Sequence, residues 1–270
     1  MKLRDIFWLW GHPEGRYNHE YGNELESRMT PMEACLYLGI RNTFMVPVGR
    51  DINRRQYNKS FTTLRQVGWD LTNTIREPGV IDTFLEEIKD FPNVGCVVFD
   101  DYKGKHLKKC DTMDAAELHT VHEQLRNNPV RRLDTWMVLY LHEFGEDPDV
   151  DAAFLPHIAP FDGIIMWNWR ESDYKKIPEK FEIFKKMTPN NRRMFGCYLW
   201  NFGERKEATG EAVTWQLDFY REKILAGEAE GVVLHTNTMA DLDYEAYDAA
   251  IRWMELHGDE EIPDDIVGRK

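Results

Sequence analysis

The sequence has no long hydrophobic run and few cysteines. Its opening, MKLRDIFWLWGHPEG, holds a short apolar stretch followed by polar turn residues, too brief for a membrane span or a signal-peptide core. The four cysteines are far apart and form no C-x-x-C pair, so neither a zinc ribbon nor a disulfide scaffold is indicated. Cys35, Cys96 and Cys197 lie in apolar segments and are expected to be buried free thiols. We therefore expect a cytoplasmic protein, with a cleaved signal peptide as the open alternative.

Positive charge is also in short supply. The chain has 47 acidic and 34 basic residues, which gives a net charge of −13 at pH 7. This balance argues against nucleic acid as a partner and favours a small neutral or weakly charged ligand. The motifs G-x-G-x-x-G, G-x-S-x-G and H-E-x-x-H are missing, as is a P-loop. Common nucleotide-binding, serine-hydrolase and zinc-protease chemistries therefore lack their signatures.

What the sequence does contain is a regular alternation of short apolar runs and longer amphipathic segments. Eight runs are expected to be strands, at residues 5–11, 43–49, 66–72, 94–101, 135–143, 162–169, 194–202 and 231–237. Most are continuously apolar, which is typical of parallel strands buried on both faces. Eight strand-then-helix units predict an α/β fold, a single-domain (β/α)8 TIM barrel over residues 1–258. An open doubly wound sheet is the alternative, and residues 259–270 are expected to form a charged, loose C-terminal tail.

The amphipathic segments carry helix start and stop signals. Thr30-Pro31-Met32-Glu33 has the form of a capping box with proline at the first helical position. Further helices are expected at 80–91, 114–128, 178–187, 209–227 and 244–258, with weaker patterns at 58–65 and 150–158. Gly227, Gly258 and Asn127 stand where helix C-caps are expected.

The expected strand ends are rich in tryptophan, amides and carboxylates. In barrels of this type the active site lies at the carboxyl ends of the strands. Aromatic faces beside hydrogen-bonding groups suit a sugar ring, which has an apolar face and a hydroxyl-rich edge. Trp8 and Trp136 lie well inside their runs and are expected in the core. The predicted ligand is a carbohydrate, and its predicted binding residues are Trp10, Tyr140, Trp167, Asn168, Trp169, Trp200, Asn201 and Asn237.

The fourth apolar run ends on two adjacent carboxylates, Asp100 and Asp101. Strand side chains alternate, so one should point into the barrel mouth and the other outward, unless the strand has already ended. Two carboxylates in one pocket repel, so one should keep its proton near neutral pH and could act as a general acid. The structural interpretation is that one aspartate caps the next segment while the other pairs with Lys103 or Lys105.

The run ending in Phe99-Asp100-Asp101 resembles the catalytic segment of the O-GlcNAcase and bacterial β-N-acetylglucosaminidase family. Leu199-Trp200-Asn201-Phe202 is similar to a late loop that surrounds the sugar in that family. The resemblance implies a barrel glycoside hydrolase that retains configuration by substrate assistance. It implies that Asp100 polarises the 2-acetamido group and that Asp101 is the general acid and then base.

Three alternatives stay open. An ordinary two-carboxylate glycosidase could pair Asp101 with Glu143, Glu171 or Glu204, and Glu143 completes the predicted catalytic set. A divalent-metal-dependent sugar isomerase or epimerase could draw on His12, His142, Glu143 and Asp100. A sugar-binding barrel without catalysis is the third. The favoured hydrolase needs no metal or cofactor, and the sequence does not predict the oligomeric state.

One long loop is notable for its aromatic residues. GHPEGRYNHEYGN, residues 11 to 23, follows the first expected strand. A polar, aromatic loop of this length at a barrel mouth is expected to form a lid or a wall of the binding site.

Overall fold

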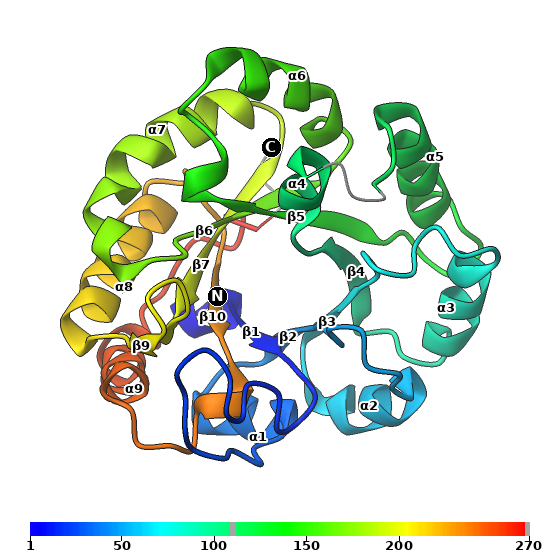
Figure 1. Cartoon of the computed structure of the whole chain (residues 1–270). Coiled ribbons are helices and arrows are strands. Elements are labelled where there is room, and N and C mark those ends of the chain that lie inside the picture. Colours follow the sequence, from blue (N-terminus) through cyan, green and yellow to red (C-terminus); the bar gives the residue numbers. More distant parts are fainter. Residues whose placement is uncertain (109–111, 268–270) are drawn as a thin grey trace.

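The computed structural model describes residues 1–108 and 112–267. Its parallel strands close into a barrel in the order β1-β10-β7-β6-β5-β4-β3-β2, as Figure 1 shows in a view down the barrel axis. The predicted (β/α)8 barrel is confirmed, and the open-sheet alternative is wrong. The barrel strands are β1 (Phe7–Gly11), β2 (Asn42–Met45), β3 (Gln66–Asp70), β4 (Val94–Phe99), β5 (Asp134–Tyr140), β6 (Gly163–Trp167), β7 (Arg192–Tyr198) and β10 (Val232–His235).

Helices surround the barrel. Those in the outer ring are α1 (Pro31–Tyr37), α2 (Arg54–Ser60), α3 (Val80–Ile88), α5 (Ala115–Arg126), α6 (Pro148–Ile158), α7 (Ile177–Met187), α8 (Gly210–Leu225) and α9 (Glu245–His257). The predicted capping box is confirmed, because Glu33 N donates to Thr30 Oγ1 while Thr30 N donates to the Glu33 carboxylate. Helix α2 begins earlier than predicted, where Asn53 accepts a hydrogen bond from Gln56 N. A short helix that the sequence did not predict, α4 (Tyr102–Leu107), directly follows the aspartate pair.

Several strands end before the predicted boundary. β4 stops at Phe99, and β5 stops at Tyr140, where the 3-10 turn η3 (Leu141–Glu143) begins. β7 stops at Tyr198, and a small antiparallel pair, β8 (Trp200–Asn201) and β9 (Lys206–Glu207), follows it. Because strand alternation ends at these points, it does not decide where the next side chains point.

Bulky aromatic side chains fill the inside of the barrel. Trp8 and Trp136 are both buried there, as predicted, and the ring of Trp8 stacks on that of Phe44 at 4.5 Å. Glycines make room for these rings: a Cβ atom at Gly163 would lie 2.2 Å from the ring of Trp136. The interior is therefore a packed core below the mouth and not an open channel.

The three cysteines predicted to be buried free thiols, Cys35, Cys96 and Cys197, are buried and unpaired. Within the described ranges, no helix combines the length and apolar character needed to cross a membrane.

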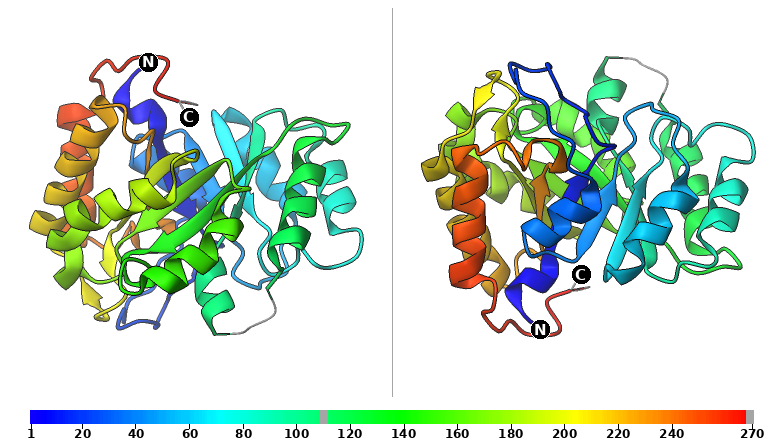
Figure 2. Two further views of the ribbon diagram at one scale, coloured as in Figure 1. Left: turned by 90° about the horizontal axis from the view of Figure 1, so that it is seen from above. Right: turned by 90° about the horizontal axis from the view of Figure 1, so that it is seen from below.

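The amino-terminal end of the barrel is closed by ion pairs and by the C-terminal segment. Arg192 pairs with Glu230 and Asp134, each at 2.5 Å. Ile262 and Ile266 are buried, and Ile262 N donates to Met1 O at 2.9 Å. The expectation of a loose tail is wrong for residues 259–267, because these isoleucines anchor it; residues 268–270 lie outside the described residues. The N-terminus lies at this end, opposite the β8-β9 pair (Figure 2).

Candidate active site

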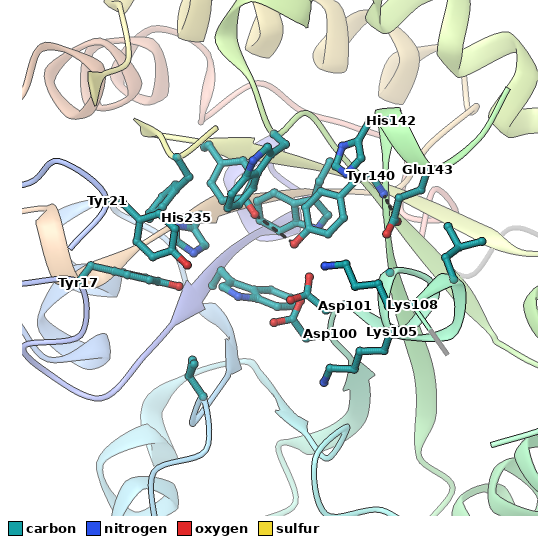
Figure 3. A pocket seen from close by; sticks show the side chains of 18 of the residues that line it. Tyr17, Tyr21, Asp100, Asp101, Lys105, Lys108, Tyr140, His142, Glu143 and His235 are labelled. Atoms are coloured by element: carbon teal, nitrogen blue, oxygen red, sulfur yellow. Dashed lines mark hydrogen bonds between the residues drawn. The ribbon is translucent and has the colours of Figure 1, made fainter. Parts of the chain in front are cut away.

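A cavity of about 700 Å³ opens at the carboxyl ends of the barrel strands (Figure 3). This volume lies within the usual range for small-molecule sites. Aromatic side chains form much of the wall: Trp10, Tyr17, Tyr21, Tyr140, Trp167, Trp169, Tyr198 and Phe202. Three carboxylates share the same cavity: Asp100, Asp101 and Glu143. The residues predicted as catalytic are thus brought together.

Both members of the aspartate pair line the cavity because β4 has already ended. Asp101 has a left-handed backbone (φ 53°), which turns the chain into α4. Its side chain makes no capping hydrogen bond to that helix. Lys103 pairs instead with Asp151 at 3.1 Å, and Lys105 Nζ donates to Asn73 Oδ1 at 2.8 Å. The structural interpretation expected one aspartate to cap the next helix and the other to pair with Lys103 or Lys105. The side-chain cap and the ion pair with Lys103 are not formed, and Lys105 bonds to Asn73.

The two aspartates differ in their surroundings. Asp101 is exposed at the mouth, whereas Asp100 is the more enclosed of the pair. Burial raises the pKa of Asp100 well above its usual range, and the nearby charges of Asp101 and Asp70 raise it further. The surroundings of Asp100 therefore favour its protonated form. The assignment of Asp101 as the general acid stays a prediction.

Glu143 is the third carboxylate of the cavity. It sits at the end of the η3 turn, where its Oε2 accepts a hydrogen bond from Tyr140 N at 2.9 Å. Burial raises its pKa to about 7, despite that hydrogen bond, and the charge of Asp101 adds to the effect. A carboxyl group with this pKa is divided between acid and base forms near neutral pH, which is what general acid catalysis requires.

Four of the predicted sugar-binding residues line the cavity: Trp10, Tyr140, Trp167 and Trp169. Trp10 meets the ring of Trp167 edge-on at 5.4 Å. Trp169 stacks on Phe202 at 5.9 Å and is only partly buried, so part of its surface is open to the cavity. These rings form the apolar surface that a sugar face needs.

The other four predicted binding residues, Asn168, Trp200, Asn201 and Asn237, lie outside the cavity lining. Trp200 Nε1 donates to Tyr21 O at 3.1 Å, and its ring packs on Tyr244. Asn168 and Asn201 are buried beside a separate small hollow. All four residues follow the end of a barrel strand: Asn168 comes after β6, Trp200 and Asn201 after β7, and Asn237 after β10.

Two of these three asparagines, Asn201 and Asn237, form hydrogen bonds with loop backbone atoms. Asn201 Oδ1 accepts hydrogen bonds from Glu171 N and Glu204 N, each at or beyond 3.2 Å. Asn237 accepts a hydrogen bond from His12 N at 2.7 Å and donates to Met29 O at 2.8 Å. These hydrogen bonds support the loops that carry the cavity wall, and the predicted binding roles stay untested.

The loop after β1 supplies wall residues that had not been singled out. Arg16, Tyr17 and Tyr21 line the cavity, as expected of a lid or wall segment. In Figure 3 the two tyrosines lie across the cavity from Asp100 and Asp101. The aromatic character of the loop predicted a wall segment, but it did not indicate which residues of the loop would line the cavity.

His235 also belongs to the cavity wall. Its Nε2 lies 3.3 Å from His12 Nε2, and His12 Nδ1 lies 2.8 Å from Val46 O. Burial lowers the pKa of His12 to about 3, so the ring is neutral and its Nδ1 donates to the carbonyl. Across the described part of the chain, no three His, Cys, Asp or Glu side chains are grouped so as to hold a metal ion. Among these described residues, the side chains named for the metal-dependent alternative, His12, His142, Glu143 and Asp100, therefore do not form a metal site.

No protein-family model matches the chain, and no curated protein matches it. Solved structures share its barrel. Active domain 2 of a chitinase from Pyrococcus furiosus is similar with a TM-score of 0.61 and 12% identity, over 95% of this chain and 97% of that chain. GH5_18 from Streptomyces cattleya, in complex with GlcNAc, is similar with a TM-score of 0.59 and 12% identity, over 97% of this chain and 82% of that chain. Tryptophan synthase from M. tuberculosis is similar with a TM-score of 0.53 and 12% identity, over 96% of this chain and 94% of that chain.

At such identities the similarity shows the (β/α)8 fold alone, and that fold also supports chemistry unrelated to sugars. The barrel resembles glycoside hydrolases in fold. The closer resemblance to O-GlcNAcases, and the roles it implies for Asp100 and Asp101, stay predictions.

Proposed function

We propose that this protein is a glycoside hydrolase. The observation that carries the proposal is that Asp100, Asp101 and Glu143 line one aromatic-walled cavity at the carboxyl ends of the strands. Glycoside hydrolysis uses a pair of carboxyl groups on either side of the scissile bond, one of them protonated. The fold similarity to a chitinase domain and to GH5_18 is consistent with such a reaction.

In the proposed reaction Glu143 is the general acid. Its proton passes to the glycosidic oxygen as the bond from that oxygen to the anomeric carbon breaks, and the Glu143 carboxylate is left behind. Asp101 faces the same cavity and stabilises the positive charge that develops at the anomeric carbon. A water molecule then bonds to that carbon, and the proton that it loses passes to the Glu143 carboxylate, which restores the acid. Glu143 replaces Asp101 as the acid because its pKa of about 7 keeps a proton available near neutral pH.

Asp100 supports this pair. Its neutral carboxyl group can donate a hydrogen bond to a substrate oxygen, which suits the polarising role that the family resemblance assigns to it. If that oxygen belongs to a 2-acetamido group, the substrate itself supplies the nucleophile. Glycosides with a 2-acetamido group should then be cleaved and the matching 2-hydroxy glycosides should not.

The test is a screen of 4-nitrophenyl α- and β-glycosides, including 2-acetamido sugars, with the wild type and three variants. On these substrates Asp101→Asn should lose most of the turnover, by about a thousandfold, whereas Glu143→Gln should lose less, because 4-nitrophenolate is a good leaving group that needs little protonation. Glu171→Gln is the matched control. Glu171 accepts a hydrogen bond from Thr209 N at 2.7 Å outside the cavity, so its loss should leave turnover close to wild type.

Two outcomes would contradict the proposal. Unchanged turnover in both cavity variants would remove the assigned carboxylates from the chemistry. Sugar binding without cleavage of any glycoside would favour the sugar-binding barrel without catalysis.

A further inference from the structure

We propose that Asp70 is a positioning residue, which acts through Thr72 to fix Asp100 in the cavity and to keep its carboxyl group protonated. The inference rests on the proposed function only for its effect on turnover. Its structural part, the control of the Asp100 proton, stands apart from any substrate.

The connection is a chain of hydrogen bonds between neighbouring strand ends. Asp70 is the last residue of β3, which pairs with β4. Asp100 N donates to Thr72 Oγ1 at 2.6 Å, and Thr72 Oγ1 donates in turn to Asp70 Oδ1 at 2.5 Å. The hydroxyl group has one proton, so its role as acceptor from Asp100 leaves that proton directed at Asp70.

Asp70 is the better site for the negative charge. Its Oδ1 receives a second hydrogen bond, from Thr72 N at 2.9 Å, and two donors on one oxygen favour the ionised form. Its side chain is buried, and that burial raises its pKa, but both Thr72 hydrogen bonds act in the opposite direction. When Asp70 is ionised, a second charge on Asp100 is unfavourable.

The backbone N–H of Asp101 and the charge of Lys105 favour ionised Asp100, but burial and the like charges of Asp101 and Asp70 outweigh them and raise its pKa. Asp101 adds a like charge, whereas Lys105 is the only cation among the main influences on the pKa of Asp100. From the facing walls, Tyr17, Tyr140 and Tyr198 are influenced by the charge of Asp100, and burial keeps all three phenols neutral. Ionised Asp100 would therefore face the like charges of Asp70 and Asp101, with Lys105 as the opposing charge.

The experiment measures the proton on Asp100 directly. Full-length protein labelled with ¹³C at the aspartate carboxyl carbon is titrated by NMR, and Asp100→Asn identifies the Asp100 resonance. The variants are Asp70→Asn and, as the matched control, Asp51→Asn, which removes an exposed carboxylate from the neighbouring β2-α2 loop. Asp70→Asn should lower the titration midpoint of Asp100 by about one pH unit or more, because a like charge is removed. Asp51→Asn should leave it in place.

A second pair of variants keeps the proposal testable if Asp70→Asn does not fold. Thr72→Val removes the hydroxyl group, so Asp70 loses a donor and competes for the proton; the midpoint of Asp100 should again fall. Thr72→Ser retains the hydroxyl group and should restore the wild-type midpoint. An Asp100 midpoint that stays within about 0.3 units of wild type in folded Asp70→Asn or Thr72→Val would overturn the inference.

The outcome is distinguishable from failure of the proposed function. If no glycoside is cleaved by the wild type, the NMR midpoints still decide whether Asp70 controls Asp100. If a glycoside is cleaved, the pH dependence of kcat/KM in Asp70→Asn should change with the midpoint. A loss of stability alone would not produce that change.

Discussion

The hydroxyl oxygens of Tyr140 and Tyr198 lie 3.4 Å apart in the cavity wall, one from the end of β5 and the other from the end of β7. Burial raises the pKa of both phenols well above the usual range, so both are neutral donors and acceptors. In Figure 3 Tyr140 lies beside the aspartate pair. This tyrosine pair is therefore in place to bind substrate hydroxyl groups next to the carboxylates.

The first prediction concerns that pair. Tyr198→Phe should reduce kcat/KM by about fivefold while the protein stays folded, because one hydrogen bond to the sugar is worth roughly 1 kcal/mol. Steady-state kinetics on the best glycoside of the screen provides the measurement. Equal kcat/KM for wild type and Tyr198→Phe would mean that this hydroxyl group does not meet the substrate.

The second prediction concerns pH and stability at Glu143. Its pKa is raised from 4.5 to about 7 in the folded protein, so its contribution to stability is fully present below about pH 4.5 and is lost as the pH rises through about 7. Glu143→Gln, which cannot ionise, should therefore be more stable than wild type at about pH 8, by up to about 3 kcal/mol, and closely similar at about pH 4. Urea unfolding at both pH values measures this difference. A Gln variant that is less stable than wild type at the higher pH would contradict the burial of this carboxylate.

The third prediction separates a cavity tryptophan from a loop-supporting one. Trp169→Ala should raise KM for the sugar by about tenfold or more with little loss of stability, because Trp169 is partly exposed in the cavity wall. Trp200→Ala should instead lower the free energy of unfolding by about 3 kcal/mol or more, because the ring is buried against Tyr244. Kinetics and thermal unfolding of both variants test the contrast. A raised KM in Trp200→Ala with little loss of stability would indicate that Trp200 binds the sugar.

The fourth prediction concerns the closed end of the barrel. Arg192 pairs with Glu230 and Asp134 and lies over the ring of Trp136 at 4.9 Å. Arg192→Ala leaves the buried Glu230 carboxylate without this partner and should cost about 3 kcal/mol of stability. Turnover below the unfolding temperature should be nearly unchanged, because the pair is remote from the mouth. An Arg192→Ala variant as stable as wild type would show that the ion pairs do not hold this end.

Much of the fold could be predicted from the sequence because barrel strands are buried on both faces and leave continuous apolar runs. The start of α1 could be predicted from local sequence, because in the capping box two side chains three residues apart accept hydrogen bonds from each other's backbone amides. Helix α4 was missed because YKGKHL has no periodic apolar face and follows the left-handed Asp101.

The candidate site was predictable where residues stand at the end of a strand. Asp100, Tyr140 and Trp167 lie in the cavity wall, since the strand direction brings them to the mouth. Residues farther along could not be placed in this way. Trp200 and Asn201 belong to a short antiparallel pair whose hydrogen bonds turn them from the mouth, and only tertiary contacts decide that direction.

The wall residues of the loop after β1 show the same limit. Tyr17 and Tyr21 both have positive φ angles and reach the cavity through a backbone path that no periodic pattern encodes. Asp70 was noted only as a strand end, because its connection to Asp100 depends on Thr72 and on the pairing of β3 with β4.

The measurement that tests the central claim most directly is the leaving-group dependence of hydrolysis by Glu143→Gln and Asp101→Asn. An aryl glycoside with a 2,4-dinitrophenyl leaving group needs no proton, whereas the matching methyl glycoside does. We predict that Glu143→Gln retains much of its turnover on the dinitrophenyl glycoside and loses it on the methyl glycoside, while Asp101→Asn loses turnover on both. Wild-type rates on both substrates in either variant would contradict the assignment of catalysis to this cavity.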